Sequence, residues 1–176
     1  MRSLWLGILA CAAMLVACGD DDSDFSTRPS DGSSSSRAKS SCSTKSSDSV
    51  VGCKTETEDN CEYSELADDR DGQIYKTVKI GDQTWMAENL NYETDSSFCY
   101  KDSDEYCEKY GRLYTWDAVV DVCPDGWHLP SKAEWETLIT AVGGQATAGK
   151  MLKSTSGGKG TDAFGFSALP AGYRVK

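Results

Sequence analysis

The sequence predicts an α+β domain, made of a small antiparallel sheet and two short helices. Residues 74–80 and 83–86 are rich in β-branched and aromatic side chains, which is typical of strands. Gly81 and Asp82 lie between them and fit a two-residue hairpin turn. Helical patterns follow later in the chain, and strands followed by helices indicate an α+β architecture.

The clearest helical pattern begins at Ser131. Pro130 holds the residue before it outside helical geometry, so Ser131 can cap the helix. Ser131 and Glu134 fit a capping box, in which each side chain satisfies a backbone donor of the other residue. The apolar residues that follow recur at the spacing of one helical face, and a glycine pair ends the helix: Trp135, Leu138, Ile139 and Val142, then Gly143 and Gly144.

Two weaker patterns complete the predicted domain. Residues 114–122 predict a short helix with Thr115 as its cap and three inward-facing residues, namely Trp116, Val119 and Val120. Residues 164–170 predict a further strand with large side chains on one face. His128 is the single histidine, and its place in a turn favours a packed or hydrogen-bonded residue over a catalyst.

The N-terminus predicts export and a lipid anchor. Arg2 precedes an apolar run of 13 residues, 4–16, which is shorter than the roughly 18 expected of a membrane-spanning helix. The run is typical of a signal peptide. The end of the run and the two residues after it read Leu-Val-Ala-Cys, residues 15–18. This resembles the bacterial lipobox and implies that Cys18 is acylated. The alternative is an ordinary secretory signal cleaved near Ala17.

An acidic segment follows Cys18. Residues 19–24 resemble the acidic tether of some surface-exposed bacterial lipoproteins, and the alternative is an ordinary solvated charge run. Gly19 is not the aspartate that resembles an inner-membrane retention signal. We therefore expect a lipid-anchored protein of the cell outer membrane, exposed at the surface.

The chain is expected to divide into three parts. Residues 1–17 form the signal peptide, 18–67 an anchored linker rich in Ser and acidic residues, and 68–176 the folded domain. The linker is nearly free of large apolar residues, so it cannot bury enough surface to offset its chain entropy. It is expected to be a flexible spacer.

The eight cysteines favour an oxidising compartment. Cys11 leaves with the signal peptide and Cys18 carries the lipid. The other six allow fifteen pairings, and the spacing does not choose among them. A disulfide closing the loop between Cys99 and Cys107 is the simplest prediction. The remaining candidates are Cys42, Cys53, Cys61 and Cys123. We expect the first three to form local disulfides within the linker.

Composition excludes several kinds of site. The net charge of −10 argues against a nucleic-acid partner, because phosphate binding needs clustered Lys and Arg. One histidine and the lack of a C-x-x-C pair argue against a metal site or cofactor. The loop acids Asp102, Asp104 and Glu105 could hold calcium, but a solvated loop is the favoured interpretation.

Four blocks of this sequence resemble, in the same order, the Fibrobacter succinogenes major paralogous domain. They are residues 71–92, 110–116, 123–135 and 165–174. The resemblance covers about 68–176 and implies an exported protein or lipoprotein. It also implies a distant likeness to C-type-lectin-like and formylglycine-generating-enzyme-like folds, carried mainly by the structural motif Trp127, Leu129, Pro130, Ser131, Glu134 and Trp135.

The resemblance further implies that the family pattern continues past the last block, to a late cysteine. The domain is therefore expected to be incomplete at its C-terminus, and the pairing of Cys123 stays open. We expect a binding or adhesion domain without enzymatic activity, with an extracellular polysaccharide or protein as ligand. The alternatives are a structural surface protein or truncated non-functional paralogue, and, less favoured, a formylglycine-generating type of enzyme. The four domain tryptophans, Trp85, Trp116, Trp127 and Trp135, are expected to pack in the core rather than stack on sugars.

Overall fold

The computed structural model describes residues 12–13, 50–157 and 159–175. The predicted signal peptide apart from Ala12 and Ala13, the lipidation residue Cys18, and Cys42 lie outside these residues. So does most of the predicted linker.

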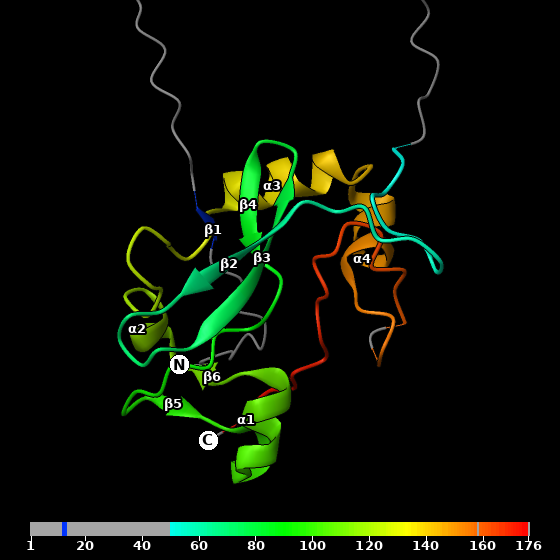
Figure 1. The fold of residues 1–176 in the computed structure, drawn as a ribbon. Coiled ribbons are helices and arrows are strands. Elements are labelled where there is room, and N and C mark those ends of the chain that lie inside the picture. Colours follow the sequence, from blue (N-terminus) through cyan, green and yellow to red (C-terminus); the bar gives the residue numbers. More distant parts are fainter. Residues whose placement is uncertain (1–11, 14–49, 158, 176) are drawn as a thin grey trace, which may run out of the picture. The chain divides into compact units, whose positions relative to one another are not determined.

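The domain combines an antiparallel sheet with several short helices, which confirms the predicted α+β class (Figure 1). Strands β2 (Tyr63–Ala67), β3 (Ile74–Ile80) and β4 (Gln83–Met86) lie in the order β4-β3-β2. The hairpin of β3 and β4 forms as predicted, with Ile80 opposite Gln83 and Gly81 at φ 61° in the turn. A two-residue strand, β1 (Ala12–Ala13), pairs with the other edge of β4.

Folded structure begins before the predicted boundary at 68. β2 lies wholly before that boundary and pairs along its length with β3, from Tyr63 opposite Val78 to Ala67 opposite Ile74. Farther back, the Lys54 ammonium lies 2.8 Å from the Asp162 carboxylate. The sequence of β2 resembles a linker because an edge strand exposes most of its side chains and needs few apolar residues.

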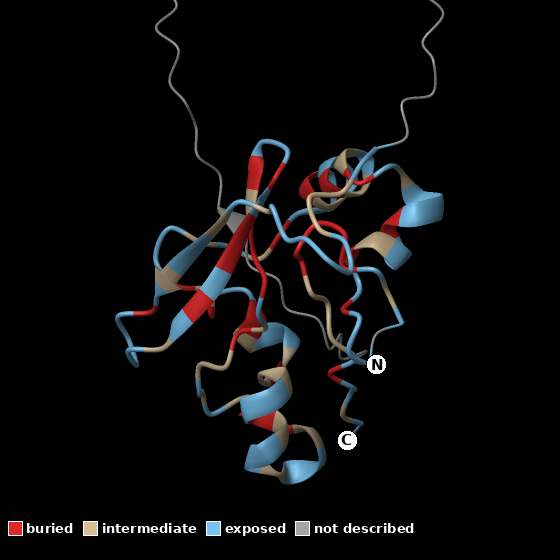
Figure 2. Cartoon of the chain, turned by 45° about the vertical axis from the view of Figure 1, so that its right-hand side comes forward, coloured by how far each residue is buried: buried red, intermediate tan, exposed pale blue. Residues whose placement is uncertain are grey.

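The sheet buries both of its faces in separate apolar clusters. On one face, Val78, Ile80 and Trp85 pack against α3 (Lys132–Ala141), α4 (Gln145–Leu152) and the segment around Phe166. On the other face, a second cluster joins the strands to the loops that follow: Tyr75, Met86, Leu90, Tyr114, Val119 and Val122. Figure 2 shows buried and exposed residues largely alternating along the long strand β3, in agreement with its burial pattern.

Helix α3 starts as the capping box predicts. The Ser131 amide donates to a Glu134 carboxylate oxygen at 2.6 Å, and the Glu134 amide donates to the Ser131 hydroxyl at 3.3 Å. Leu138 and Val142 are fully buried, and Trp135 packs against Trp85. The predicted apolar stripe is therefore the face that covers the sheet.

The helix predicted at 114–122 is shorter than expected. Helix α2 (Trp116–Val119) is capped by Thr115 as predicted, because its hydroxyl accepts the Ala118 amide at 3.2 Å. Val119 faces inward, but Trp116 is 67% exposed and Val120 is 51% exposed. The prediction that all three face inward is wrong, since one helical turn presents only one of them to the core.

The strand predicted at 164–170 does not form. Gly165 and Ser167 have φ values of 68° and 56°, which interrupt an extended chain. The Asp162 carboxylate accepts both the amide and the hydroxyl of Ser167, at 2.7 and 2.8 Å, and holds this bend. Phe164 and Phe166 are nevertheless buried, so the large residues do reach the core.

Besides β1 and β2, five elements have no counterpart in the sequence prediction: η1 (Tyr100–Asp102), α1 (Asp104–Tyr110), α4, and the paired strands β5 (Ser97–Phe98) and β6 (Leu113–Tyr114). Apart from α4, each spans at most two helical turns or two strand residues. Periodicity is undetectable over such lengths.

Glu134 links the start of α3 to the preceding turn. One carboxylate oxygen accepts the Ser131 amide, and the other lies 2.6 Å from His128 Nε2. His128 thus makes a hydrogen bond, as expected of a structural residue. Burial by itself would raise the pKa of the Glu134 carboxyl, but the bonds from Ser131 and His128 outweigh it and hold this pKa below its ordinary value.

Replacing Glu134 by Gln should lower the free energy of unfolding at neutral pH by about 1 kcal/mol, because the amide keeps the capping geometry but loses the charge. A carboxyl whose folded pKa is lowered stabilises the protein above its unfolded pKa of roughly 4.3, and that contribution disappears as the pH falls through the folded pKa. Urea unfolding at a series of pH values across this range should therefore show that the free energy of unfolding falls less steeply with decreasing pH in E134Q than in the unaltered protein. Glu136→Gln, on the exposed side of α3, is the control and should change stability by under about 0.5 kcal/mol. Equal effects of the two substitutions would contradict this assignment.

Candidate binding groove

A groove lies where one face of β3 extends past the first apolar cluster. Side chains two residues apart share a face of a strand, so Ile74 and Lys76 point to the same side as Val78 and Ile80. Val78 and Ile80 are buried beneath the helices, whereas Ile74 and Lys76 are exposed. This uncovered end of the strand borders a cavity of about 450 Å³, which is large enough for a small ligand.

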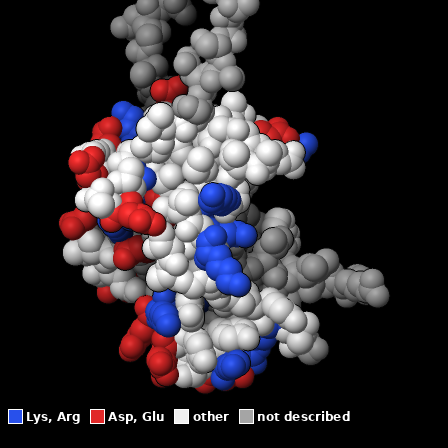
Figure 3. All heavy atoms as spheres, turned by 90° about the vertical axis from the view of Figure 1, so that its right-hand side faces the viewer, with Lys and Arg blue, Asp and Glu red and all other residues white. Residues whose placement is uncertain are grey.

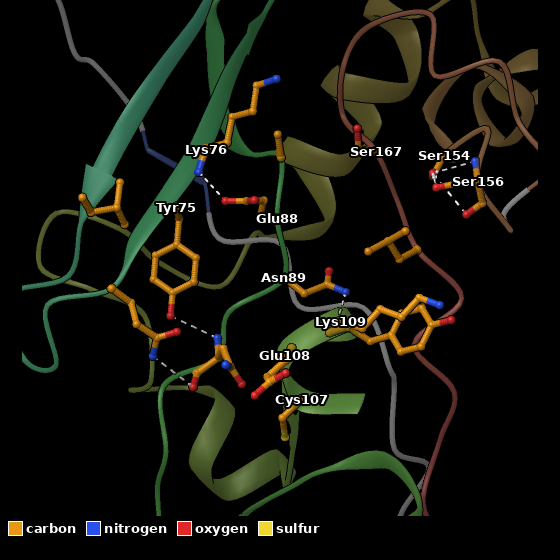
Figure 4. A pocket seen from close by; sticks show the side chains of 17 residues that line it. Tyr75, Lys76, Glu88, Asn89, Cys107, Glu108, Lys109, Ser154, Ser156 and Ser167 are labelled. Carbon is orange, nitrogen blue, oxygen red and sulfur yellow. Dashed lines mark hydrogen bonds between the residues drawn. The ribbon is translucent and has the colours of Figure 1, made fainter. Parts of the chain in front are cut away.

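Four segments meet around this cavity (Figure 4). Strand β3 forms one side, together with the chain from Ala87 to Asn91. The end of α1 forms another wall through residues 107–111. The opposite side comes from the C-terminal part of the chain and carries three hydroxyl side chains, Ser154, Ser156 and Ser167.

The chain that follows β4 is fastened to both neighbouring walls. The Lys76 amide donates to the Glu88 carboxylate at 2.6 Å, and the Asn89 amide side chain donates to the Tyr110 carbonyl at 2.8 Å. Gly111 allows the close approach to α1, because a Cβ there would lie 2.7 Å from Asn89 Cβ and from the Leu90 carbonyl. These contacts hold Glu88 and Asn89 at fixed positions in the groove.

Asn91 adds an unsatisfied acceptor to the lining. Its backbone amide donates to the Tyr75 hydroxyl at 3.1 Å. Its side-chain oxygen is buried and has no hydrogen-bond partner within the described part of the chain. A buried acceptor without a donor typically costs about 1–3 kcal/mol, and this oxygen is closed off from solvent. Burial also raises the pKa of Tyr75 to about 12, so its hydroxyl remains protonated at neutral pH.

The charges around the groove are mixed. Two lysines and two glutamates line it together, namely Lys76, Lys109, Glu88 and Glu108. Figure 3 shows basic side chains in the middle of one face of the molecule, with acidic side chains mainly along one side of it. This balance suits a neutral polar ligand better than a polyanion or a polycation.

The α1 wall depends on a short helix and on a disulfide. Cys99 and Cys107 are bonded, as the sequence predicts, and join η1 to α1. The wall carries a row of tyrosines: the rings of Tyr100 and Tyr106 meet edge to face at 5.3 Å, and those of Tyr106 and Tyr110 lie 6.1 Å apart at 14°. Tyr110 is half-buried and lines the groove.

The other predicted site residues lie elsewhere. The structural motif Trp127, Leu129, Pro130, Ser131, Glu134 and Trp135 builds the turn and start of α3 and does not line the groove. Cys53 and Cys61 form a second disulfide, and Cys123 is disulfide-bonded as well. Among the three loop acids Asp102, Asp104 and Glu105, Asp102 forms an ion pair with Arg174.

The described residues contain neither a metal-binding cluster nor a membrane-spanning helix. Within 12–13, 50–157 and 159–175, no group of three or more His, Cys, Asp or Glu side chains is placed to hold a metal ion. In the same ranges, no helix has the length and apolar character needed to span a bilayer.

The sequence did not reveal the groove, because its walls come from four segments separated by up to about ninety residues along the chain. Ile74 begins the predicted strand, and only the fold shows that it is 62% exposed. A large apolar residue exposed on a strand marks a face that the core leaves uncovered.

Removing the Cys99–Cys107 disulfide should loosen the α1 wall. A seven-residue helix is marginal by itself, and a disulfide closing a short loop contributes about 2–3 kcal/mol. We expect amide hydrogen exchange over 104–111 to rise about tenfold or more in the Cys99→Ser, Cys107→Ser double variant. The matched control is Cys53→Ser, Cys61→Ser, which opens a disulfide of the same sequence separation and should leave exchange in α1 unchanged. Equal protection of α1 in both variants would contradict this role.

Comparison with protein families gives one match. The model of the Fibrobacter succinogenes major domain matches residues 78–176, which is more than half of the chain. The matched region includes α1, α3 and every wall of the groove except the start of β3. No curated protein and no solved structure matches the chain. The chain therefore belongs to the Fibrobacter succinogenes major domain family.

Proposed function

We propose that this protein is a lipid-anchored binding protein of the cell envelope whose domain binds carbohydrate in the groove beside β3. The observation that carries the proposal is the convergence of Glu88, Asn89 and Tyr110 on one open cavity. A sugar presents many hydroxyl groups and an apolar ring face. Carboxylate and amide side chains match the hydroxyls, and an aromatic ring matches the apolar face.

Further features of the groove support a neutral sugar. The serine hydroxyls of the opposite wall add acceptors, with Ser167 donating to Asp162 and Ser154 bonded to Ser156. The lysines and glutamates of the lining offset one another, which disfavours a strongly charged ligand. The proposal assigns no catalytic role to the groove.

The anchor is proposed from the N-terminal sequence. The apolar run 4–16 followed by the lipobox-like Leu-Val-Ala-Cys places the lipid on Cys18, and the acidic segment after it favours display at the surface of the outer membrane. The disulfides of the domain support an oxidising compartment. A distant C-type-lectin-like fold remains part of this proposal as an expectation from sequence.

A structural surface protein is the second candidate. It is favoured by the packing of Trp85, which is fully buried, and of Trp135, which is partly buried against it, because neither ring is presented as an open platform for a sugar. Under this alternative the groove has no ligand, so direct binding measurements separate the two functions.

The anchor is tested by replacing Cys18 with Ser. The unaltered chain should fractionate with membranes and yield an N-terminal peptide carrying acyl groups on Cys18. The C18S chain should lose the acyl groups and leave the membrane fraction, because cleavage of the signal peptide removes the apolar run and no lipid remains to hold the chain. Mass spectrometry of the N-terminal peptide distinguishes the acylated form from the unacylated form by mass. An unmodified N-terminus at or near residue 18 in the unaltered chain would indicate an ordinary secreted protein.

Carbohydrate binding is tested by replacing Tyr110 with Ala. The unaltered protein should bind at least one glycan in a panel of neutral and acidic oligosaccharides, and Y110A should weaken that binding about fivefold to tenfold through the lost ring contact. Isothermal titration measures both affinities. Trp116→Ala is the control, since this side chain is 67% exposed and lies outside the groove. Loss of binding in W116A rather than Y110A would move the site to α2, and no binding to any glycan would favour the structural alternative.

A further inference from the structure

We propose that the ligand is an extended neutral polysaccharide, which runs from the groove across Lys76 and Glu88 into a second cavity on the same surface. This inference rests on the proposed carbohydrate function and adds to it the length and charge of the ligand.

The second cavity adjoins the groove directly. It has a volume of about 390 Å³ and is lined by Tyr63, Ser64, Glu65, Ile74, Lys76 and Glu88. The last three of these residues also line the groove. The two cavities are therefore neighbours separated only by the side chains that they share.

The shared residues form a fixed division between the cavities. The Lys76 amide is bonded to Glu88, and the Lys76 ammonium lies 3.4 Å from the centre of the Tyr63 ring. The bond from the backbone amide fixes the Glu88 carboxylate, and the Tyr63 ring holds the Lys76 ammonium, so these two side chains keep the cavities apart. Two adjoining subsites of similar size suit a repeating ligand better than a single compact one.

Ile74 provides an apolar surface between these polar walls. Its side chain is 62% exposed although it belongs to a paired strand, opposite Ala67 of β2. Covering an exposed apolar residue is favourable at roughly 25 cal/mol per Å² of apolar area removed from water. The apolar face of a sugar unit passing from one cavity to the other would cover Ile74.

The charges of the two cavities together select the type of polysaccharide. Lys76 and Lys109 are set against Glu65, Glu88 and Glu108, and the whole chain carries a net charge of −10. A chain of uronic acids would meet more negative than positive charge along its length. A neutral glycan meets no such repulsion and can use the carboxylates as hydrogen-bond acceptors.

The test compares affinity with ligand length. Neutral glucan, xylan and mannan ladders, each from disaccharide to octasaccharide, are titrated into the full chain. In at least one ladder the affinity of the unaltered protein should rise about tenfold with length, as the second cavity becomes occupied. Glu65→Arg, which alters only the second cavity, should abolish this rise and leave disaccharide binding unchanged. Tyr110→Ala should weaken binding at every length.

Two further variants make the outcome decisive. Glu62→Arg carries the same charge change on an exposed residue outside both cavities and should keep the rise with length. Glu65→Tyr fills the second cavity with a ring and adds no positive charge, so it should act like E65R, even if E65R folds poorly. Length-independent binding, or equal behaviour of E65R, E65Y and E62R, would overturn the extended site while leaving carbohydrate binding intact. Binding of a polygalacturonate ladder in preference to the neutral ladders would overturn the neutral ligand, and no binding to any ladder would overturn this proposal.

Discussion

The contact among Trp85, Trp135 and Phe166 determines how the parts of this domain fit together. Trp85 is fully buried, and its ring centre lies 4.9 Å from that of Trp135 and 5.8 Å from that of Phe166. The three rings join β4, α3 and the C-terminal part of the chain. Because Phe166 is held in this cluster, the next residue, Ser167, lies beside the sheet and forms part of the groove wall. The wall of the candidate site is therefore a consequence of core packing.

Strand β3 serves the core at one end and the candidate site at the other. A strand with both faces covered would be entirely structural, but the helices on one face stop before its beginning. The turn at this uncovered end is held separately. The buried Asp68 carboxylate accepts two bonds from the Arg70 guanidinium, at 2.7 and 2.6 Å, and this pairing lowers the pKa of Asp68. Arg70 also stacks over the Tyr92 ring at 3.9 Å. These contacts keep the exposed end of β3 ordered.

Sequence reasoning succeeded where neighbouring residues determine the structure. The hairpin around Gly81, the Ser131–Glu134 capping box and the Cys99–Cys107 loop all depend on groups within a few residues of one another. It was wrong about β2 and about the segment near Phe166. An edge strand needs few apolar residues, and the bend at Ser167 depends on hydrogen bonds that Ser167 donates to the Asp162 carboxylate, which a strand-like composition does not disclose.

The sequence by itself determined the family, the class of fold, the capped helix and one disulfide, and it supplied the expectation of a lipid anchor on Cys18. Only the tertiary structure decided where a ligand can bind. Glu88, Asn89 and Tyr110 are unremarkable polar and aromatic residues along the chain, and Ser167 follows them by more than fifty positions. They meet because the aromatic core cluster and the end of α1 bring distant segments against the uncovered part of β3. Such convergence depends on packing between segments, which no local pattern encodes.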